Sequence, residues 1–152
     1  MRAVIPAMAG STWFVLDALA VQEVMGARAW VPLPHASPET PGVLAWRGRA
    51  VAVLDVGKFL DGCSPLRASA PCPRTLVVEA GDCTMAIPVD AVREVHEVGP
   101  LAVRSVAVGT GRTTDEVVLG ERTMPLLDLG AVIARLLHEP APGLGLAEGE
   151  AR

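Results

Sequence analysis

The chain has 152 residues, of which 51% are hydrophobic and 20% are charged. This size and composition predict one folded domain with a substantial core and exclude a disordered chain. The net charge of −4 provides no basic field for nucleic acid, and no apolar run approaches the roughly 20 residues of a membrane helix. We therefore expect no nucleic-acid partner and no direct membrane contact.

Short apolar blocks separated by 15 glycines and 13 prolines predict many short strands and little helix. In chain order, we expect strands near residues 2–8, 11–17, 20–24, 28–33, 42–46, 49–56, 74–80, 83–89, 91–98, 101–108, 115–119 and 122–129. The first is interpreted as a strand rather than a signal peptide, because its apolar region is short and broken by Pro6. A short turn is expected at Lys58–Leu60. Helical spacing of apolar residues predicts one helix at Ala131–His138, which Pro140 ends.

Two segments lack any periodic pattern. Residues 61–73, rich in Pro, Ser and Ala, predict an interior linker, and residues 139–152, rich in Pro, Gly, Ala and Glu, predict a mobile tail. These boundaries predict one domain over residues 1–138, divided into halves at about 1–60 and 74–138.

The two halves resemble each other in sequence. Ala20–Val24 matches Ala91–Val95 at an offset of 71 residues, and Arg49–Val56 matches Arg122–Leu129 at an offset of 73 residues. Each half holds about five predicted strands, too few to bury a full core alone. The repeat predicts two small barrels that share or exchange strands, with a single sandwich as the competing arrangement.

The first half contains a sharp corner between two apolar runs. Gly42–Trp46 and Ala50–Val56 read as strands, and Gly48 between them permits a tight turn. Arg47 at this corner carries a permanent charge and five hydrogen-bond donors in a rigid fork. Our central hypothesis is that the corner docks another protein. The alternative is that Arg47 only closes the strand corner through backbone carbonyls.

Six sequence blocks follow one another in a specific order and at specific spacings. They are Ala20-Val21-Gln22-Glu23-Val24, Gly42-Val43-Leu44-Ala45-Trp46-Arg47-Gly48, Ala52-Val53-Leu54-Asp55-Val56, Thr75–Glu79, Ile87–Val95 and Met124–Leu129. They resemble the V-x-E-[IV] segment, the G-V-x-N-L-R-G corner and the [IV]-P-[IV]-[IV]-D-L strand of the CheW-like domain of bacterial chemotaxis coupling proteins. The resemblance runs from about residue 2 to residue 137.

The resemblance implies an all-β fold of two intertwined five-stranded SH3-like β-barrels with a short C-terminal helix, without catalysis or cofactors. It implies a cytoplasmic adaptor between the tip of a methyl-accepting chemoreceptor and the regulatory domain of a CheA-type histidine kinase. The family's receptor-binding positions map onto Val21, Glu23, Gly42, Arg47 and Gly48. A valine beside a Glu and an Arg makes a small apolar spot with charged edges, suited to the flank of a receptor helix.

The chain departs from the family pattern at the corner. Ala45-Trp46 stands in place of Asn-Leu, and Ala52 in place of Pro. We include Trp46 among the partner-binding residues because Trp is a common interface anchor, with packing in the core as the alternative. Glu23 has an alternative structural role as the ion-pair partner of Arg47. The departures favour, as a second function, a divergent adaptor of a non-flagellar pathway, such as gliding motility or development, that retains only one interface.

A small β-barrel enzyme is the remaining alternative. Cys72 or Cys83 with His96 could supply a nucleophile and a base, although no third orienting group or oxyanion loop stands at a telling spacing. Asp55 and Asp128 end equivalent strands, and because the Asp is repeated we predict two helix caps rather than a catalytic pair.

The spacing of the cysteines and histidines predicts no metal site. Cys63, Cys72 and Cys83 are too widely spaced for a metal or redox motif, which favours reduced thiols in a cytoplasmic protein. His35, His96 and His138 are isolated from one another in the sequence, without neighbours at ligand spacing.

Overall fold

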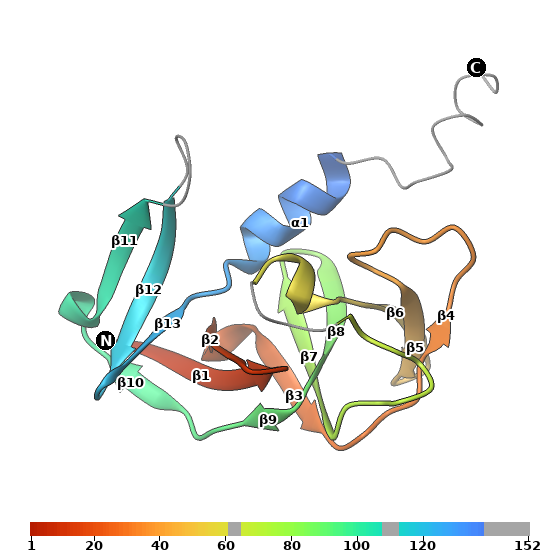
Figure 1. The fold of residues 1–152 in the computed structure, drawn as a ribbon, viewed down its shortest axis with the longest axis horizontal. Coiled ribbons are helices and arrows are strands. Elements are labelled where there is room, and N and C mark those ends of the chain that lie inside the picture. The colour runs from red at the N-terminus through yellow and green to blue at the C-terminus, as the bar shows by residue number, and fades with distance from the viewer. Residues whose placement is uncertain (61–64, 108–112, 139–152) are drawn as a thin grey trace.

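The computed structural model describes residues 1–60, 65–107 and 113–138 (Figure 1). The predicted tail, Cys63 and part of the predicted linker lie outside the described residues. The strands are β1 (Arg2–Ala9), β2 (Thr12–Asp17), β3 (Val21–Met25), β4 (Val31–Pro32), β5 (Gly42–Trp46), β6 (Arg49–Val53), β7 (Arg74–Ala80), β8 (Cys83–Val89), β9 (Ala91–Val92), β10 (His96–Val98), β11 (Val103–Ala107), β12 (Thr113–Leu119) and β13 (Arg122–Pro125). The helix is α1 (Leu129–His138), and single 3-10 turns lie at Ala18–Ala20, Val56–Lys58 and Pro100–Ala102.

One sheet, which we call unit I, has the strand order β3-β7-β8-β6-β5-β4. Its β3 pairs antiparallel with β7, and its β6 runs parallel to β8. Strands β3 to β6 come from the first half of the chain, and β7 and β8 come from the second half. Unit I is therefore built from both halves.

The remaining strands, which we call unit II, repeat this arrangement with the halves exchanged. Here β10 and β9 pair with β1, β1 pairs with β2, and β11-β12-β13 form a three-stranded sheet. A parallel bridge between Val15 and Leu126 joins β2 to the end of β13, as β8 is joined to β6 in unit I. Figure 1 shows unit II beside unit I, with α1 above their junction. The two units are related by the sequence repeat.

The apolar residues gather in three clusters. Unit I encloses one around Trp46 and Val77, unit II encloses a second around Val15 and Val117, and the largest lies between the units. Because side chains alternate along a strand, β7, β8 and β2 bury both faces, one inside their own unit and one in the central cluster. Such strands contain continuous apolar runs, here Leu76–Val78 and Met85–Val89.

The all-β fold with a short C-terminal helix is confirmed. In detail, the paired strands of the described residues form open orders rather than closed rings, and unit I has six strands rather than five. The predicted strand at 91–98 is interrupted at Arg93–Val95, and the one at 28–33 is reduced to Val31–Pro32, where Pro32 lacks an N–H for a continued ladder. No helix among the described residues is long and apolar enough to cross a membrane.

Candidate functional site

The hairpin between β5 and β6 ends in a two-residue turn at Arg47 and Gly48. Trp46 pairs with Arg49 across it, and both turn residues have positive φ, 47° for Arg47 and 76° for Gly48. Positive φ at both central positions is the signature of a type I′ turn, whose twist matches that of the flanking strands. Gly48 adopts this region without strain, whereas Arg47 does so against its preference.

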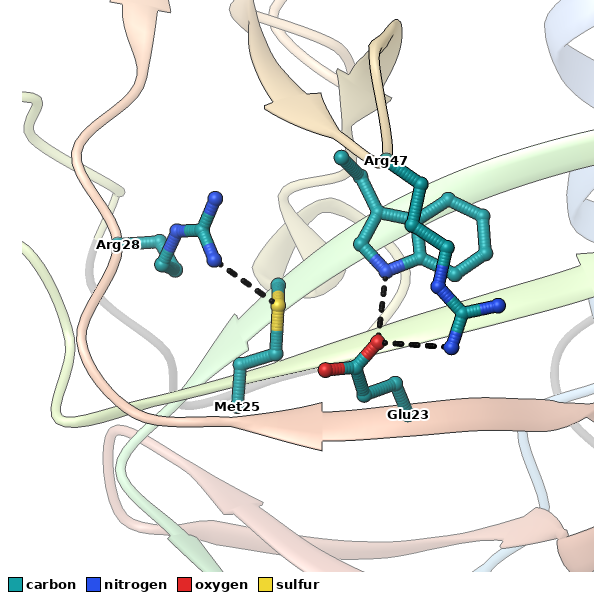
Figure 2. Close-up of polar contacts among 5 residues, drawn as sticks. Glu23, Met25, Arg28 and Arg47 are labelled. Atoms are coloured by element: carbon teal, nitrogen blue, oxygen red, sulfur yellow. Dashed lines mark hydrogen bonds and ion pairs between the residues drawn. The ribbon is translucent and has the colours of Figure 1, made fainter.

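The Glu23 carboxylate lies beside this turn. One oxygen, Oε1, accepts a hydrogen bond from the Trp46 indole Nε1 at 3.0 Å and lies 3.3 Å from an Arg47 guanidinium nitrogen. The Arg47 guanidinium carbon also stands 4.7 Å from the centre of the Trp46 ring. Figure 2 shows Glu23 reaching from β3 toward Arg47 on the hairpin. We call Glu23, Trp46, Arg47 and Gly48 the arginine corner.

Trp46 supports the corner from inside the protein. Its side chain is only 6% exposed and packs in the unit I cluster with Met25, Trp30 and Leu44. The indole therefore offers little surface to a partner, and the packing interpretation of Trp46 is the one that its burial favours. What it offers is a buried ring and a fixed N–H that hold the Arg47 and Glu23 side chains in place.

Two further arginines flank the arginine corner and were not among the predicted site residues. Arg28, just after β3, donates to the Ala45 carbonyl oxygen at 2.9 Å and contacts the Met25 sulfur at 3.3 Å (Figure 2). Arg49 stands 5.9 Å from the Trp46 ring centre and donates to Thr84 Oγ1 at 3.0 Å. Arg28 has no local sequence signal, because only the rolled sheet brings it to β5. With three arginines and one carboxylate, this surface is basic on a protein of net charge −4.

Val21 and Gly42 do not join the arginine corner. A β-bulge between Val21 and Glu23 breaks the alternation that would place both on one face, and Val21 packs against the central cluster. Gly42 is buried at the far end of β5, where a Cβ would come within 2.2 Å of the Val31 carbonyl oxygen and 2.6 Å of the Trp30 ring. Close backbone approach explains this glycine. Leu19 and Val24, 87% and 47% exposed, are the large apolar residues that β3 and the preceding turn present to solvent.

The repeated aspartates cap turns, as predicted. Asp55, 3% exposed, accepts hydrogen bonds from the Gly57 and Leu66 amides, and Asp128 accepts from the Ala131 amide at the start of α1. Asp55 therefore ends β6 earlier than predicted, and Asp128 lets the helix begin at Leu129.

Among the described cysteines, Cys72 lies in surroundings that disfavour an activated thiol. Burial raises the pKa of the Cys72 thiol, and the carboxylates of Asp90 and Asp55 raise it further, which is the reverse of what a nucleophile needs. Cys83 is half-buried at the start of β8, and His96 lies exposed on β10 opposite Val4. In the described ranges, no group of three or more His, Cys, Asp or Glu side chains could hold a metal ion.

Comparison with known proteins agrees with this fold. The family described as "CheW-like domain" matches residues 4–137. Among solved structures, the fold is similar to that of the scaffolding protein TtCheW from Thermoanaerobacter tengcongensis, with a TM-score of 0.70 and 19% sequence identity over 84% of each chain. No curated protein matches the chain. Because the family match spans most of the sequence and the strand arrangement agrees with it, this chain belongs to the CheW-like domain family.

Proposed function

We propose that this protein is a cytoplasmic adaptor that couples methyl-accepting chemoreceptors to a CheA-type histidine kinase. CheW-like domains are non-catalytic scaffolds of chemotaxis signalling, so the Cys/His enzyme alternative is wrong. What we propose beyond this is the pair of partners, and the arginine corner as the surface that contacts the receptor tip.

The backbone of Arg47 carries the proposal. Three other two-residue hairpins, at Gly10, Gly81 and Gly120, have glycine at the first turn position, with φ near 60°. Gly120 is the repeat equivalent of Arg47, 73 residues on. Only at the arginine corner does an L-residue of these hairpins take the left-handed conformation.

The stability of the fold does not explain why arginine rather than glycine occupies this left-handed turn position. A left-handed L-residue costs roughly 1–2 kcal/mol. An exposed ion pair contributes about 0.2–1 kcal/mol, and an exposed cation–π contact about 0.5–1 kcal/mol. These gains about cancel the cost, so Arg47 adds little that glycine would not. Strain without a stability gain is typical of functional positions.

The geometry suits a helical partner with acidic side chains. The Arg47 side chain is 66% exposed yet held by Glu23 and the Trp46 ring, so binding orders it at little further entropic cost. Arg28 and Arg49 add positive charge, and Leu19 and Val24 add exposed apolar surface nearby on the chain. A helix presenting carboxylates beside an apolar stripe fits this combination.

Calorimetric titration of the purified protein with a receptor-tip fragment, and separately with a kinase regulatory domain, tests the proposal. We expect binding to both, and Arg47→Glu should weaken receptor binding by about tenfold or more, since it places a carboxylate beside Glu23. Arg104→Glu is the matched control, because Arg104 is 60% exposed in an ion pair with Glu116 on unit II. Absence of binding to either fragment would refute the coupling function. Parent-like receptor binding by Arg47→Glu would remove the arginine corner from it.

A further inference from the structure

Unit II has its own exposed arginines, gathered on one tryptophan. The Arg93 and Arg122 guanidinium carbons stand 5.1 Å and 5.6 Å from the centre of the Trp13 ring. Trp13 lies on β2 and packs partly against the unit II cluster, while Arg93 follows β9 and Arg122 begins β13. Three segments far apart in the sequence therefore meet at one half-buried indole, which we call the Trp13 site.

The sequence repeat places an equivalent contact in unit I. Arg122 is the equivalent of Arg49, and Trp13 is the equivalent of Thr84. In unit I, Arg49 donates to Thr84 at 3.0 Å, so equivalent positions touch in both units. In unit II the hydroxyl is replaced by an indole, and Arg93 is added at the position equivalent to Gln22. The Trp13 site is thus the unit II equivalent of the Arg49–Thr84 contact, with an indole in place of the hydroxyl and a second arginine.

The Trp13 site differs from the arginine corner in its charge balance. Glu23 lies 3.3 Å from Arg47 in unit I, and its repeat equivalent in unit II is Glu94. Across the described residues, neither Arg93 nor Arg122 has a carboxylate within 4.0 Å, although Glu94 and Glu121 adjoin them in sequence. Stacking on an aromatic ring leaves the N–H edges of a guanidinium available. The Arg93 and Arg122 guanidinium groups are therefore held by the Trp13 ring without a carboxylate partner among the described residues.

We propose that Trp13, Arg93 and Arg122 form a second docking site, which binds an acidic protein segment presenting two carboxylates. Two ordered guanidinium groups match two carboxylates, and Trp and Arg are among the residues enriched at the energetic centres of protein interfaces. A nucleic-acid strand fits less well, because its affinity comes from many phosphate contacts, whereas this site offers two cations on a protein of net charge −4. This site is separate from the arginine corner and goes beyond the receptor contact proposed there.

Titration with an octaglutamate peptide, followed by NMR at an ionic strength of about 0.01 M, tests the proposal, since charges are little screened there. The Trp13 indole N–H resonance, assigned from Trp13→Phe, reports on the site. We expect it to shift saturably, and Arg93→Gln/Arg122→Gln to weaken peptide binding by about tenfold or more. Arg67→Gln/Arg74→Gln is the matched control: it removes the same charge from two exposed arginines, one just before β7 and one on it, and should leave binding unchanged.

Three outcomes would overturn the proposal. They are an unshifted Trp13 resonance, equal weakening by both double variants, which would mean only non-specific attraction, and equally tight binding of an octathymidine strand at the same residues. Arg47→Glu should leave the octaglutamate shift at Trp13 unchanged. This result separates the Trp13 site from the arginine corner, so either proposal can fail without the other.

Discussion

The indole N–H of Trp46 on β5 donates to the carboxylate of Glu23 on β3 across 3.0 Å. These strands do not pair, because β7, β8 and β6 lie between them in the sheet order. The bond therefore links two strands that come together only because the sheet is rolled. The hydrogen bond from Arg28 to the Ala45 carbonyl links the same two parts of the sheet nearby. Side chains join β3 to β5 where no backbone ladder does.

Trp46→Phe removes this bond and keeps most of the buried ring. We expect a loss of about 1 kcal/mol in the free energy of unfolding, the usual net value of one hydrogen bond, and weaker receptor binding because Glu23 and Arg47 lose their support. Urea denaturation and calorimetry measure the two effects. Glu23→Gln is the comparison, since an amide oxygen still accepts from the indole. A larger loss of unfolding free energy in Glu23→Gln than in Trp46→Phe would contradict this account.

Arg47→Gly separates folding from binding. Glycine adopts the φ of 47° without strain, which offsets the loss of the Glu23 and Trp46 contacts. We expect the free energy of unfolding to stay within about 1 kcal/mol of the parent, with receptor binding reduced as in Arg47→Glu. Should Arg47→Gly unfold markedly more easily, Arg47 would be a structural residue and the argument from strain would be wrong.

Gly42→Ala tests whether Gly42 is a packing residue. A Cβ would lie 2.2 Å from a backbone oxygen and 2.6 Å from Trp30, so β4 and β5 would have to separate. We expect a loss of about 3 kcal/mol or more, seen as a lower Tm in thermal denaturation. Gly26→Ala is the control, because nothing lies within 4 Å of its Cβ position, and it should change Tm little or raise it. Equal Tm values for the two variants would refute the close-approach explanation.

Glu39 predicts a dependence of stability on pH. Its pKa is lowered from 4.5, first by the hydrogen bond from Ser37 and then, against the opposing effect of burial, by its own backbone amide and the charges of Arg135 and Lys58. A lowered folded pKa stabilises the fold above the unfolded value, and this stabilisation is lost as pH falls through the folded pKa.

Ser37→Ala should therefore destabilise the protein most above pH 4.5, with a difference from the parent that shrinks as the solution becomes more acidic. Urea denaturation across an acidic pH series measures it. In a Glu39→Gln background the effect of Ser37→Ala should no longer vary with pH. A difference that grew on acidification would have the wrong sign and would exclude Glu39 as its source.

Local signals were enough for the predictions that came true. Apolar alternation located most strands, Gly48 marked the tight turn, and the repeated Asp55 and Asp128 identified two caps, because each depends only on neighbours in the sequence. The predicted Glu23–Arg47 pair also forms. The repeat made paired barrels a reasonable expectation.

What the sequence could not provide depends on strand register and on the third dimension. The bulge that separates Val21 from Glu23 is invisible in a period-two pattern, and Arg28 reaches β5 only because unit I is rolled. Trp13, Arg93 and Arg122 are 29 or more residues from one another, so no local pattern connects them in the sequence. Such contacts follow from long-range pairing, for which one chain offers no local signal.

The exchange of strands between the halves has a consequence for how the molecule could be divided. A cut between β6 and β7 leaves two fragments, neither of which contains a complete unit: the first lacks β7 and β8 of unit I, and the second lacks β1 and β2 of unit II. Each fragment alone exposes the apolar side chains that now form the central cluster. The fragments can regain their order only by re-associating, which makes this polypeptide the topological equivalent of a tethered heterodimer.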